Sequence, residues 1–369
     1  MTGTEIIRSA TFEGMADGQG YPTEDYLNYY RKLSGHVKTM ITGFMYISET
    51  GRAMHPGQAG LDEPGKAEAF RPVTRAVHDN GGRIIAQIAH VGRQTTDALA
   101  VGVSARKSPY FGVRPRVLTA GEIKKVVREF ADAAMLARRA GFDGVQLHCA
   151  HGYLIHQFML ASVNDRSDGY GDPYRFLREV VAAVRRQCGN DYPVWVKISG
   201  EVDIQPHSKQ DFIEVIKVLD ELQVDAIEIS RGTMDLALNI FRGRVPLGTV
   251  LKHNPVYAPK SIWYQLFVLP FVRLKMKGFK PCYNAGYAKL AEQHTKIPVY
   301  CVGGFRSRQD ILDSGLKHIS LCRPLICEPD FLTKLKQNPD YRSKCTNCNI
   351  CAVMVDTERK LRCYGGKEQ

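Results

Sequence analysis

Eight short apolar runs alternate along the chain with longer amphipathic segments, and this alternation is the feature that most constrains the fold. The runs are apolar on successive residues, which indicates strands that are covered on both faces. Helical segments lie between them, as crossover connections between parallel strands require. The runs are EIIRSA, KTMITGFMYI, GRIIAQIA, DGVQLHC, PVWVKIS, DAIEIS, IPVYCVG and KHISLC. Eight such units predict an α/β protein built as a (β/α)8 TIM barrel.

The segment from Thr119 to Gly141 has the clearest helical pattern. Its apolar residues recur at spacings of three and four, as on the buried face of a helix. Thr119 is followed three residues later by Glu122, the pattern of a capping box, and Gly141 closes the segment. The sequence therefore predicts a helix here, with the next strand beginning at Gly144.

The composition agrees with a globular protein, since 44% of the 369 residues are hydrophobic. A formal net charge of +12 favours anionic ligands such as phosphate-bearing cofactors or thioesters. The basic residues are spread over helix faces, so we do not expect nucleic-acid binding. No apolar run reaches eighteen residues and the first residues do not form a signal peptide. The sequence thus predicts a cytoplasmic protein that does not associate with a membrane.

Two parts of the chain do not fit a plain barrel. The segment 232–294 is longer than one crossover requires, and its prolines break any single helix. We expect it to lie over the barrel mouth as a substrate lid. Beyond it, we predict that the barrel covers residues 1–336 and that residues 337–369 form a cysteine-rich tail.

The stretch 146–171 carries the strongest candidates for catalysis. In a barrel, residues just after the carboxyl ends of strands face the active site, and His148, His151 and Tyr153 occupy such positions. Two imidazoles three residues apart can donate hydrogen bonds to one carbonyl oxygen, and a neighbouring phenol can protonate the adjacent carbon. Any one of these side chains alone would be read as a packed core residue. Their combination predicts a catalytic site.

Three motifs together resemble the old yellow enzyme family of FMN-dependent barrel oxidoreductases. They are HCAHGYLIHQF with NDRSDGYG, AQIAHVGR at residues 86–93, and VGGF with LCRPLI at residues 302–326. The resemblance runs from Arg8 to about Lys336. It implies a structural, hydrogen-bonded turn for the polar residues that follow the histidines: Asn164, Arg166, Asp168 and Tyr170.

The resemblance also implies roles for the catalytic candidates. His148 and His151 would bind the carbonyl oxygen of an α,β-unsaturated substrate. Tyr153 would give a proton to Cα after hydride leaves flavin N5 for Cβ. Gln87 would bond the polar edge of the isoalloxazine ring, and NAD(P)H would reduce the flavin.

Further positions are assigned to FMN by the same resemblance. The phosphate would be held by Gly303, Gly304 and Arg323, because glycine N–H groups approach phosphate closely and arginine adds a bidentate cation. The remaining flavin contacts depart from the usual family residues. Lys197 stands where arginine is common near flavin N1 and O2, Cys322 stands where glycine precedes the phosphate arginine, and the first strand ends in Ser9, Ala10 and Thr11.

Four of the ten cysteines cluster in the tail. Cys345, Cys348, Cys351 and Cys363 have a spacing that suits a [4Fe-4S] cluster, with zinc as the competing occupant and an unliganded tail as the third reading. The tail resembles the cluster segment of the 2,4-dienoyl-CoA reductase and trimethylamine dehydrogenase branch. The chain stops at Gln369, before that branch's FAD- and nucleotide-binding region. We therefore expect either a separate electron-transfer protein or direct reduction of FMN by NAD(P)H.

The sequence thus predicts an FMN-dependent reductase of an enone, enal or enoyl thioester. An amine-oxidising, demethylating flavoenzyme is the nearest alternative. A tRNA-modifying flavin barrel would suit the positive charge, but not the histidine–tyrosine motif. A non-catalytic flavin or iron-sulfur electron-transfer module would need neither Tyr153 nor His148. The substrate and the assembly into a homo-oligomer stay open.

Overall fold

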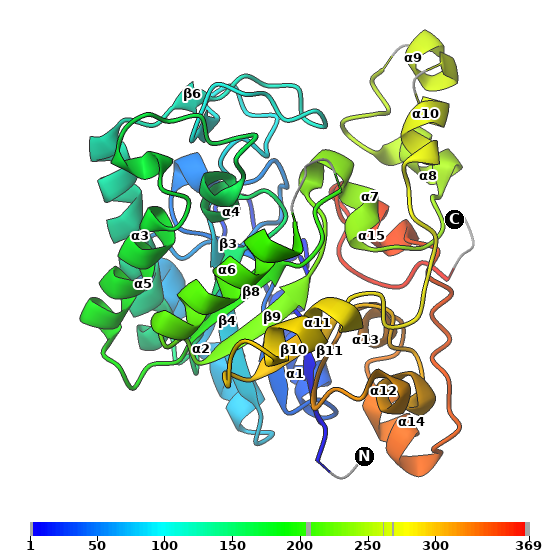
Figure 1. The fold of residues 1–369 in the computed structure, drawn as a ribbon. Coiled ribbons are helices and arrows are strands. Elements are labelled where there is room, and N and C mark those ends of the chain that lie inside the picture. Colours follow the sequence, from blue (N-terminus) through cyan, green and yellow to red (C-terminus); the bar gives the residue numbers. More distant parts are fainter. Residues whose placement is uncertain (1–2, 204–207, 261, 268, 366–369) are drawn as a thin grey trace.

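A closed barrel of parallel strands forms the centre of the molecule (Figure 1). A computed structural model describes residues 3–203, 208–260, 262–267 and 269–365. Each barrel strand pairs in parallel with the next, and β1 pairs with β11 to close the ring. The strands are β1 (Glu5–Arg8), β2 (Thr39–Ile41), β4 (Arg83–Ala89), β7 (Val145–Cys149), β8 (Val194–Ser199), β9 (Ala226–Ser230), β10 (Val299–Val302) and β11 (His318–Leu321). The eight predicted strands and the TIM-barrel fold are confirmed.

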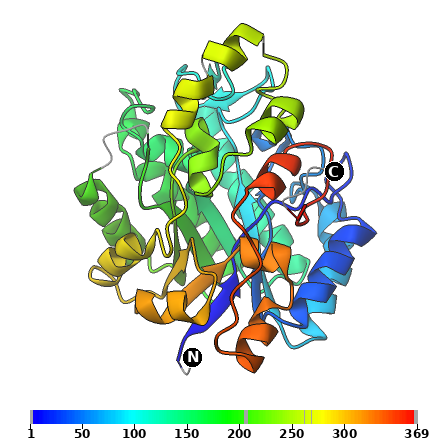
Figure 2. The same cartoon turned by 90° about the vertical axis from the view of Figure 1, so that its right-hand side faces the viewer.

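Helices that follow the strands along the chain cover the outside of the barrel, as Figures 1 and 2 show. They are α1 (Glu24–Ser34), α2 (Pro64–His78), α3 (Ala120–Arg139), α5 (Arg175–Cys188), α6 (Lys209–Glu221), α11 (Ala285–Glu292), α12 (Arg308–Ser314) and α14 (Phe331–Gln337). The predicted capping box is present at the start of α3, where the side chains of Thr119 and Glu122 each accept the other residue's backbone N–H. The following strand begins at Val145, one residue after the predicted Gly144.

The barrel interior changes from apolar to polar along the strand direction. Near the amino ends of the strands, Trp195 stacks on Tyr300 with ring centroids 4.9 Å apart. These rings belong to an apolar interior cluster with Ile7, Ile41, Ile85 and Ala226. Further along, β7, β8 and β9 place His148, Lys197 and Glu228 at matching register positions. A layer of polar side chains therefore lies on the apolar layer, toward the carboxyl ends of the strands.

Shorter elements lie in the loops. They are β3 (Met45–Tyr46), β5 (Val101–Gly102), β6 (Arg116–Val117), α4 (Leu154–Met159), α13 (Arg323–Cys327) and the 3₁₀ turns η1 (Glu49–Gly51), η2 (Gly169–Gly171) and η3 (Met234–Leu236). After α4, Asn164 donates to the carbonyls of Phe158 and Tyr170, and Asp168 pairs with Arg166 and accepts the Tyr170 amide. The predicted structural turn is confirmed.

The segment 232–294 forms several short helices rather than one crossover. Before α11 it contains α7 (Ala237–Ile240), α8 (Leu247–His253), α9 (Ile262–Phe267) and α10 (Leu269–Leu274). Figure 1 shows α9 and α10 projecting beyond the barrel, while α7 lies beside the tail helix. Residues 261 and 268 lie outside the described part.

The tail runs back over the barrel and carries α15 (Ile350–Met354). Arg342 forms a bridge with Ser307, and the Leu361 amide donates to the carbonyl of Glu13. Figure 2 shows α15 near the N-terminal part of the chain. Val355 and Leu361 belong to the main hydrophobic cluster. The tail is thus packed on the barrel, and its treatment as a separate unit from residue 337 stays a prediction. None of the described helices is long and apolar enough to cross a membrane.

Candidate active site

The three predicted catalytic side chains come together at the carboxyl end of β7. The rings of His148 and His151 have centroids 4.9 Å apart, and those of His148 and Tyr153 are 4.5 Å apart. His151 has φ of 60°, a strained backbone conformation for a residue with a Cβ. All three line one cavity with Gln87 and Lys197. The grouping predicted from the sequence is therefore present in the structure.

Burial sets the protonation of these side chains. It lowers the pKa of both histidines well below the ordinary value, with a further contribution from the Lys197 charge. The His148 Nδ1 accepts the amide of Ala150 at 3.4 Å, so Nε2 carries the proton of the neutral ring. His151 Nε2 lies 2.8 Å from Ser230 Oγ. Burial also raises the pKa of Tyr153, so its phenol keeps a proton at neutral pH.

A chain of hydrogen bonds supports the floor of this cavity. Gln87 Nε2 donates to Gln146 at 2.7 Å, and Gln146 Nε2 donates to Glu228 at 3.0 Å. Lys197 Nζ donates to Glu228 and to Ser9 Oγ, each at 2.9 Å. Burial alone would raise the pKa of Glu228, but Lys197 and these hydrogen bonds outweigh it and lower the pKa. Lys197 therefore faces a carboxylate that the sequence analysis missed, although a lone glutamate in the apolar run DAIEIS was a signal for it.

A second cavity extends from this floor to the ends of β10 and β11. It is lined by Gly303, Gly304 and Arg323, and by Ser9, Ala10 and Cys322. Gly303 and Gly304 have φ of 136° and 87°, and a Cβ on Gly304 would lie 2.7 Å from two backbone atoms. Arg323 Nη1 donates to Asn349 Oδ1 at 2.7 Å and to the Arg242 carbonyl at 2.9 Å.

This second cavity suits a phosphate. Its side-chain-free glycines allow close approach of an anion, and Arg323 and Arg306 supply positive charge. The buried Ser320 Oγ and Arg306 Nε have no hydrogen-bond partner within the described residues. Thr11 Oγ1 lies 3.3 Å from Cys322 Sγ on the wall between the two cavities. The residues present therefore fit the phosphate group of the FMN that the resemblance implies.

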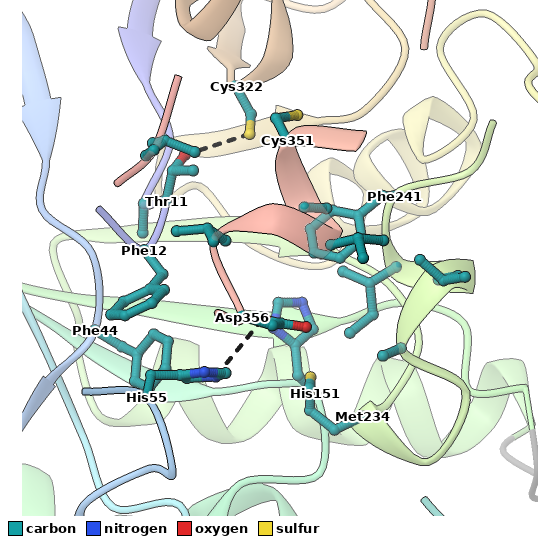
Figure 3. Close-up of a pocket in the computed structure, with 18 of the residues that line it drawn as sticks. Thr11, Phe12, Phe44, His55, His151, Met234, Phe241, Cys322, Cys351 and Asp356 are labelled. Carbon is teal, nitrogen blue, oxygen red and sulfur yellow. Dashed lines mark hydrogen bonds and ion pairs between the residues drawn. The ribbon is translucent and has the colours of Figure 1, made fainter. Parts of the chain in front are cut away.

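Sequence reasoning missed several residues of the first cavity because they come from distant loops. Figure 3 shows Asp356, which follows α15, projecting between His55 and His151. Asp356 Oδ1 lies 3.8 Å from His55 Nε2, beyond hydrogen-bond length. Aromatic and apolar side chains complete the wall, among them Phe12, Phe44, Tyr110, Tyr257 and Met234. The predicted lid segment supplies Met234, Asn254 and Tyr257 to this wall.

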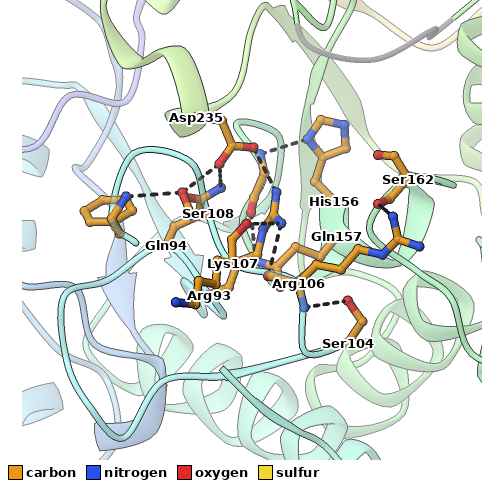
Figure 4. A network of polar contacts seen from close by, with 12 residues as sticks. Arg93, Gln94, Ser104, Arg106, Lys107, Ser108, His156, Gln157, Ser162 and Asp235 are labelled. Atoms are coloured by element: carbon orange, nitrogen blue, oxygen red, sulfur yellow. Dashed lines mark hydrogen bonds and ion pairs between the residues drawn. The ribbon is translucent and has the colours of Figure 1, made fainter. Parts of the chain in front are cut away.

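A buried ion pair beneath the rim fixes the loop that carries Met234 (Figure 4). Arg93 Nη2 donates to Asp235 Oδ2 at 2.9 Å, and Ser108 Oγ donates to Asp235 Oδ1 at 2.7 Å. Gln94 Nε2 adds a third bond to the same carboxylate at 3.2 Å. Burial lowers the pKa of Arg93, and Asp235 opposes that shift. The AQIAHVGR motif thus supports the rim as well as the cavity floor.

The four tail cysteines line one further cavity, next to Arg323 (lining residues Cys345, Cys348, Cys351 and Cys363, with Cys327). Cys327 was not among the predicted ligands. Cys351 also lines the first cavity. Within the described residues, no group of three or more His, Cys, Asp or Glu side chains is arranged to hold a metal ion. The thiols share a cavity, but the metal site stays a prediction.

Comparison with known proteins agrees with this geometry. Residues 6–253 match the model of the NADH:flavin oxidoreductase / NADH oxidase family. An NADH oxidase from Thermoanaerobacter brockii is 27% identical over 97% of this chain and 53% of its own length. An old yellow enzyme homologue from Zymomonas mobilis is 26% identical, with a TM-score of 0.71 over 93% of this chain and 92% of that one.

A third match supports the fold alone. A 2-naphthoyl-CoA reductase in complex with 2-naphthoyl-CoA has a TM-score of 0.80 at 21% identity, over 98% of this chain and 54% of that one. The chain spans about half the length of this reductase and of the T. brockii relative. The family match covers most of the barrel, including the histidine–tyrosine segment. The chain belongs to the NADH:flavin oxidoreductase / NADH oxidase family, and its fold is that of an old yellow enzyme homologue.

Proposed function

We propose that this chain reduces the C=C bond of an α,β-unsaturated carbonyl compound or enoyl thioester. The observation that carries the proposal is the grouping of His148, His151 and Tyr153 on one cavity wall, above a floor formed by Gln87 and Lys197. A hydride and a proton add across the double bond, and NAD(P)H is oxidised to supply the two electrons. FMN, when bound, supplies the hydride.

The chain's own residues orient and protonate the substrate. The neutral His148 donates a hydrogen bond from Nε2–H to the carbonyl oxygen, and His151 donates a second hydrogen bond to the same oxygen. This polarises the carbonyl as negative charge develops on it. Tyr153 keeps its proton at neutral pH and delivers it to Cα. The aromatic wall excludes water from the reacting carbon.

The residues that line the two cavities support the flavin contacts that we propose. Gln87 and Lys197 would bind the polar part of the flavin, with Ser9, Ala10 and Thr11 beside it. Gly303, Gly304 and Arg323, next to Cys322, would hold its phosphate. The Lys197 charge favours a reduced, anionic flavin, but its partner Glu228 offsets part of that charge.

Two observations favour thioesters among the substrates. The chain carries a formal charge of +12, which attracts the phosphates of an acyl-CoA. One protein of the same fold is named for its reduction of 2-naphthoyl-CoA. A direct comparison of kcat/KM for an enoyl-CoA and for the matching simple enone tests this preference.

We further propose that Cys345, Cys348, Cys351 and Cys363 hold a [4Fe-4S] cluster that exchanges single electrons with a separate protein. The supports are their spacing and their common cavity. Iron, sulfide, zinc and flavin measured on one anaerobic sample test the idea. About four iron atoms per chain are expected, and zinc or an iron-free tail would contradict it.

The central test is Tyr153→Phe. Removing the phenolic proton should slow enone reduction by roughly 10² to 10⁴-fold, because general acid catalysis contributes about that much. Reduction of the flavin by NAD(P)H should stay within about twofold, since that half-reaction does not use the phenol. Rapid-mixing absorbance of the flavin separates the two steps. Tyr170→Phe, which removes a phenol bonded to Glu179 outside the cavity, is the control. An unchanged enone rate in Tyr153→Phe would refute the role.

A further inference from the structure

Asp356 is a carboxyl group in the cavity wall that the proposed chemistry does not use. Among the described residues that line the first cavity, it is the one acidic side chain. The tail carries it to the cavity: α15 crosses the mouth, and the chain then turns inward beside His55 and His151 (Figure 3). Its side chain is 21% exposed, toward the cavity.

Within the described part of the chain, no hydrogen bond reaches this carboxyl. Its ion-pair contact is the His55 ring, with Nε2 at 3.8 Å from Oδ1. Burial lowers the pKa of His55 to about 4, so that ring is neutral and offers no charge. Burial also raises the pKa of Asp356 to about 7, and among the described residues no cation counteracts the shift.

A largely buried carboxyl that forms no hydrogen bond lowers stability unless a ligand supplies one. The side chains around Asp356 are suited to the rest of such a ligand. Phe12, Phe44, Tyr110 and Tyr257 line the same cavity. Aromatic faces pack on apolar groups and attract cations. Two cations that line this cavity are engaged elsewhere. Lys197, on the cavity floor, bonds Glu228, and Arg323, beside the second cavity, bonds Asn349.

We propose that Asp356 is a specificity residue that selects substrates bearing a hydrogen-bond donor, a hydroxyl or a protonated amine, in addition to the reacting carbonyl. The inference rests on the proposed enone reduction. A substrate with the donor satisfies the carboxyl, whereas one with an apolar group of the same shape leaves it buried and unpaired. Sites built in this way discriminate strongly against the analogue that lacks the donor.

The test uses matched pairs of para-substituted benzalacetones. Hydroxymethyl is compared with ethyl, and dimethylaminomethyl, which is protonated at neutral pH, with isobutyl. The kcat/KM ratio is measured within each pair for the wild type, Asp356→Leu and Asp356→Asn. Glu358→Gln, which changes an exposed carboxyl two residues along the tail, is the matched control. Dissociation constants of the corresponding saturated ketones, measured by calorimetry, give a readout that needs no turnover.

The wild type should prefer each donor over its apolar partner by on the order of tenfold. Asp356→Leu should bring both ratios to within about twofold, and Glu358→Gln should keep them. Asp356→Asn should keep the hydroxyl preference and lose much of the amine preference, because an amide still accepts a hydrogen bond but carries no charge. A larger ratio for the amine pair assigns an ammonium group, and a larger ratio for the hydroxyl pair assigns an alcohol.

The two proposals fail in different ways. Donor preference in the calorimetric constants without any enone turnover would overturn the proposed reaction and keep the role of Asp356. The role of Asp356 would be overturned if the wild type reduced enones but bound both ketones of each matched pair with equal dissociation constants. It would also be overturned if the kcat/KM ratios within the pairs were unchanged in both Asp356 variants.

Discussion

Replacing Asp356 by asparagine should change the pH dependence of stability in a calculable way. Burial raises the pKa of this carboxyl from 3.8 to about 7 in the folded protein. Between these two values the folded state holds a proton that the unfolded state has released. The free energy of unfolding of the wild type therefore carries a contribution that falls as pH rises through this window.

The magnitude follows from the shift. Each unit of pKa difference corresponds to about 1.4 kcal/mol, so the full shift amounts to on the order of 4 kcal/mol at pH 8. The side chain is 21% exposed toward the cavity, so this figure is an upper value. Asparagine has nearly the same shape and does not titrate. Relative to the wild type, Asp356→Asn should gain stability steadily from about pH 4 to pH 7 and then level off.

Urea unfolding of both proteins at closely spaced pH values measures the difference. Burial lowers the pKa of His55 to about 4 and of His90 to about 3, so both proteins lose stability on acidification below about pH 6.5. That loss is common to the pair and cancels in the difference. Glu358→Gln, which changes an exposed carboxyl of the same tail, is measured alongside as the control variant. A flat difference between Asp356→Asn and wild type from pH 4 to pH 8 would show that the carboxyl is not held uncharged in the fold.

Three further predictions concern the floor, the phosphate end and the rim. Glu228→Gln leaves the Lys197 charge uncompensated and should raise the flavin midpoint potential, by roughly 30 mV for each 1.4 kcal/mol by which the reduced flavin is stabilised. Spectroelectrochemistry measures this potential. An unchanged potential would show that the Lys197 charge does not act on the flavin. Gly304→Ala places a Cβ 2.7 Å from backbone in a left-handed conformation, so FMN affinity should fall by on the order of tenfold or more. Gly278→Ala, with open space around it, should bind FMN normally in the same fluorescence titration. Asp235→Asn removes the negative charge beside the buried Arg93 and should lower the free energy of unfolding by about 3 to 5 kcal/mol. Denaturant-induced unfolding measures this loss. A loss below about 1 kcal/mol would contradict a buried ion pair between Arg93 and Asp235.

The barrel could be predicted from the sequence because each pattern that indicates it lies within a short segment of the chain. Strands buried on both faces appear as continuous apolar runs, and the capping box of α3 lies within four residues. His148, His151 and Tyr153 share one strand end, so their grouping follows from one loop. These parts need no knowledge of which distant segments meet.

The missed residues are those whose surroundings depend on contacts between distant segments. Glu228 meets Lys197 only because β8 and β9 are neighbours in register. His55 and Asp356 are three hundred residues apart and meet because the tail folds over the mouth. Cys327 joins the tail thiols from α13, outside the spacing pattern. Neither a periodicity nor a motif within one segment predicts such contacts between distant parts of the chain.

The closure of the ring has a consequence for the order of synthesis. Because β1 pairs with β11, the first strand must wait for residues near 320 before its second edge is covered. The tail comes later still, and its Leu361 amide bonds the carbonyl of Glu13 beside the first strand. During synthesis on the ribosome, the segment that contains Asp356 and the tail cysteines therefore completes the walls of the cavities at the barrel mouth after the barrel strands have been made. Until that segment is made, the first cavity lacks the part of its wall that Cys351, Val353 and Asp356 supply.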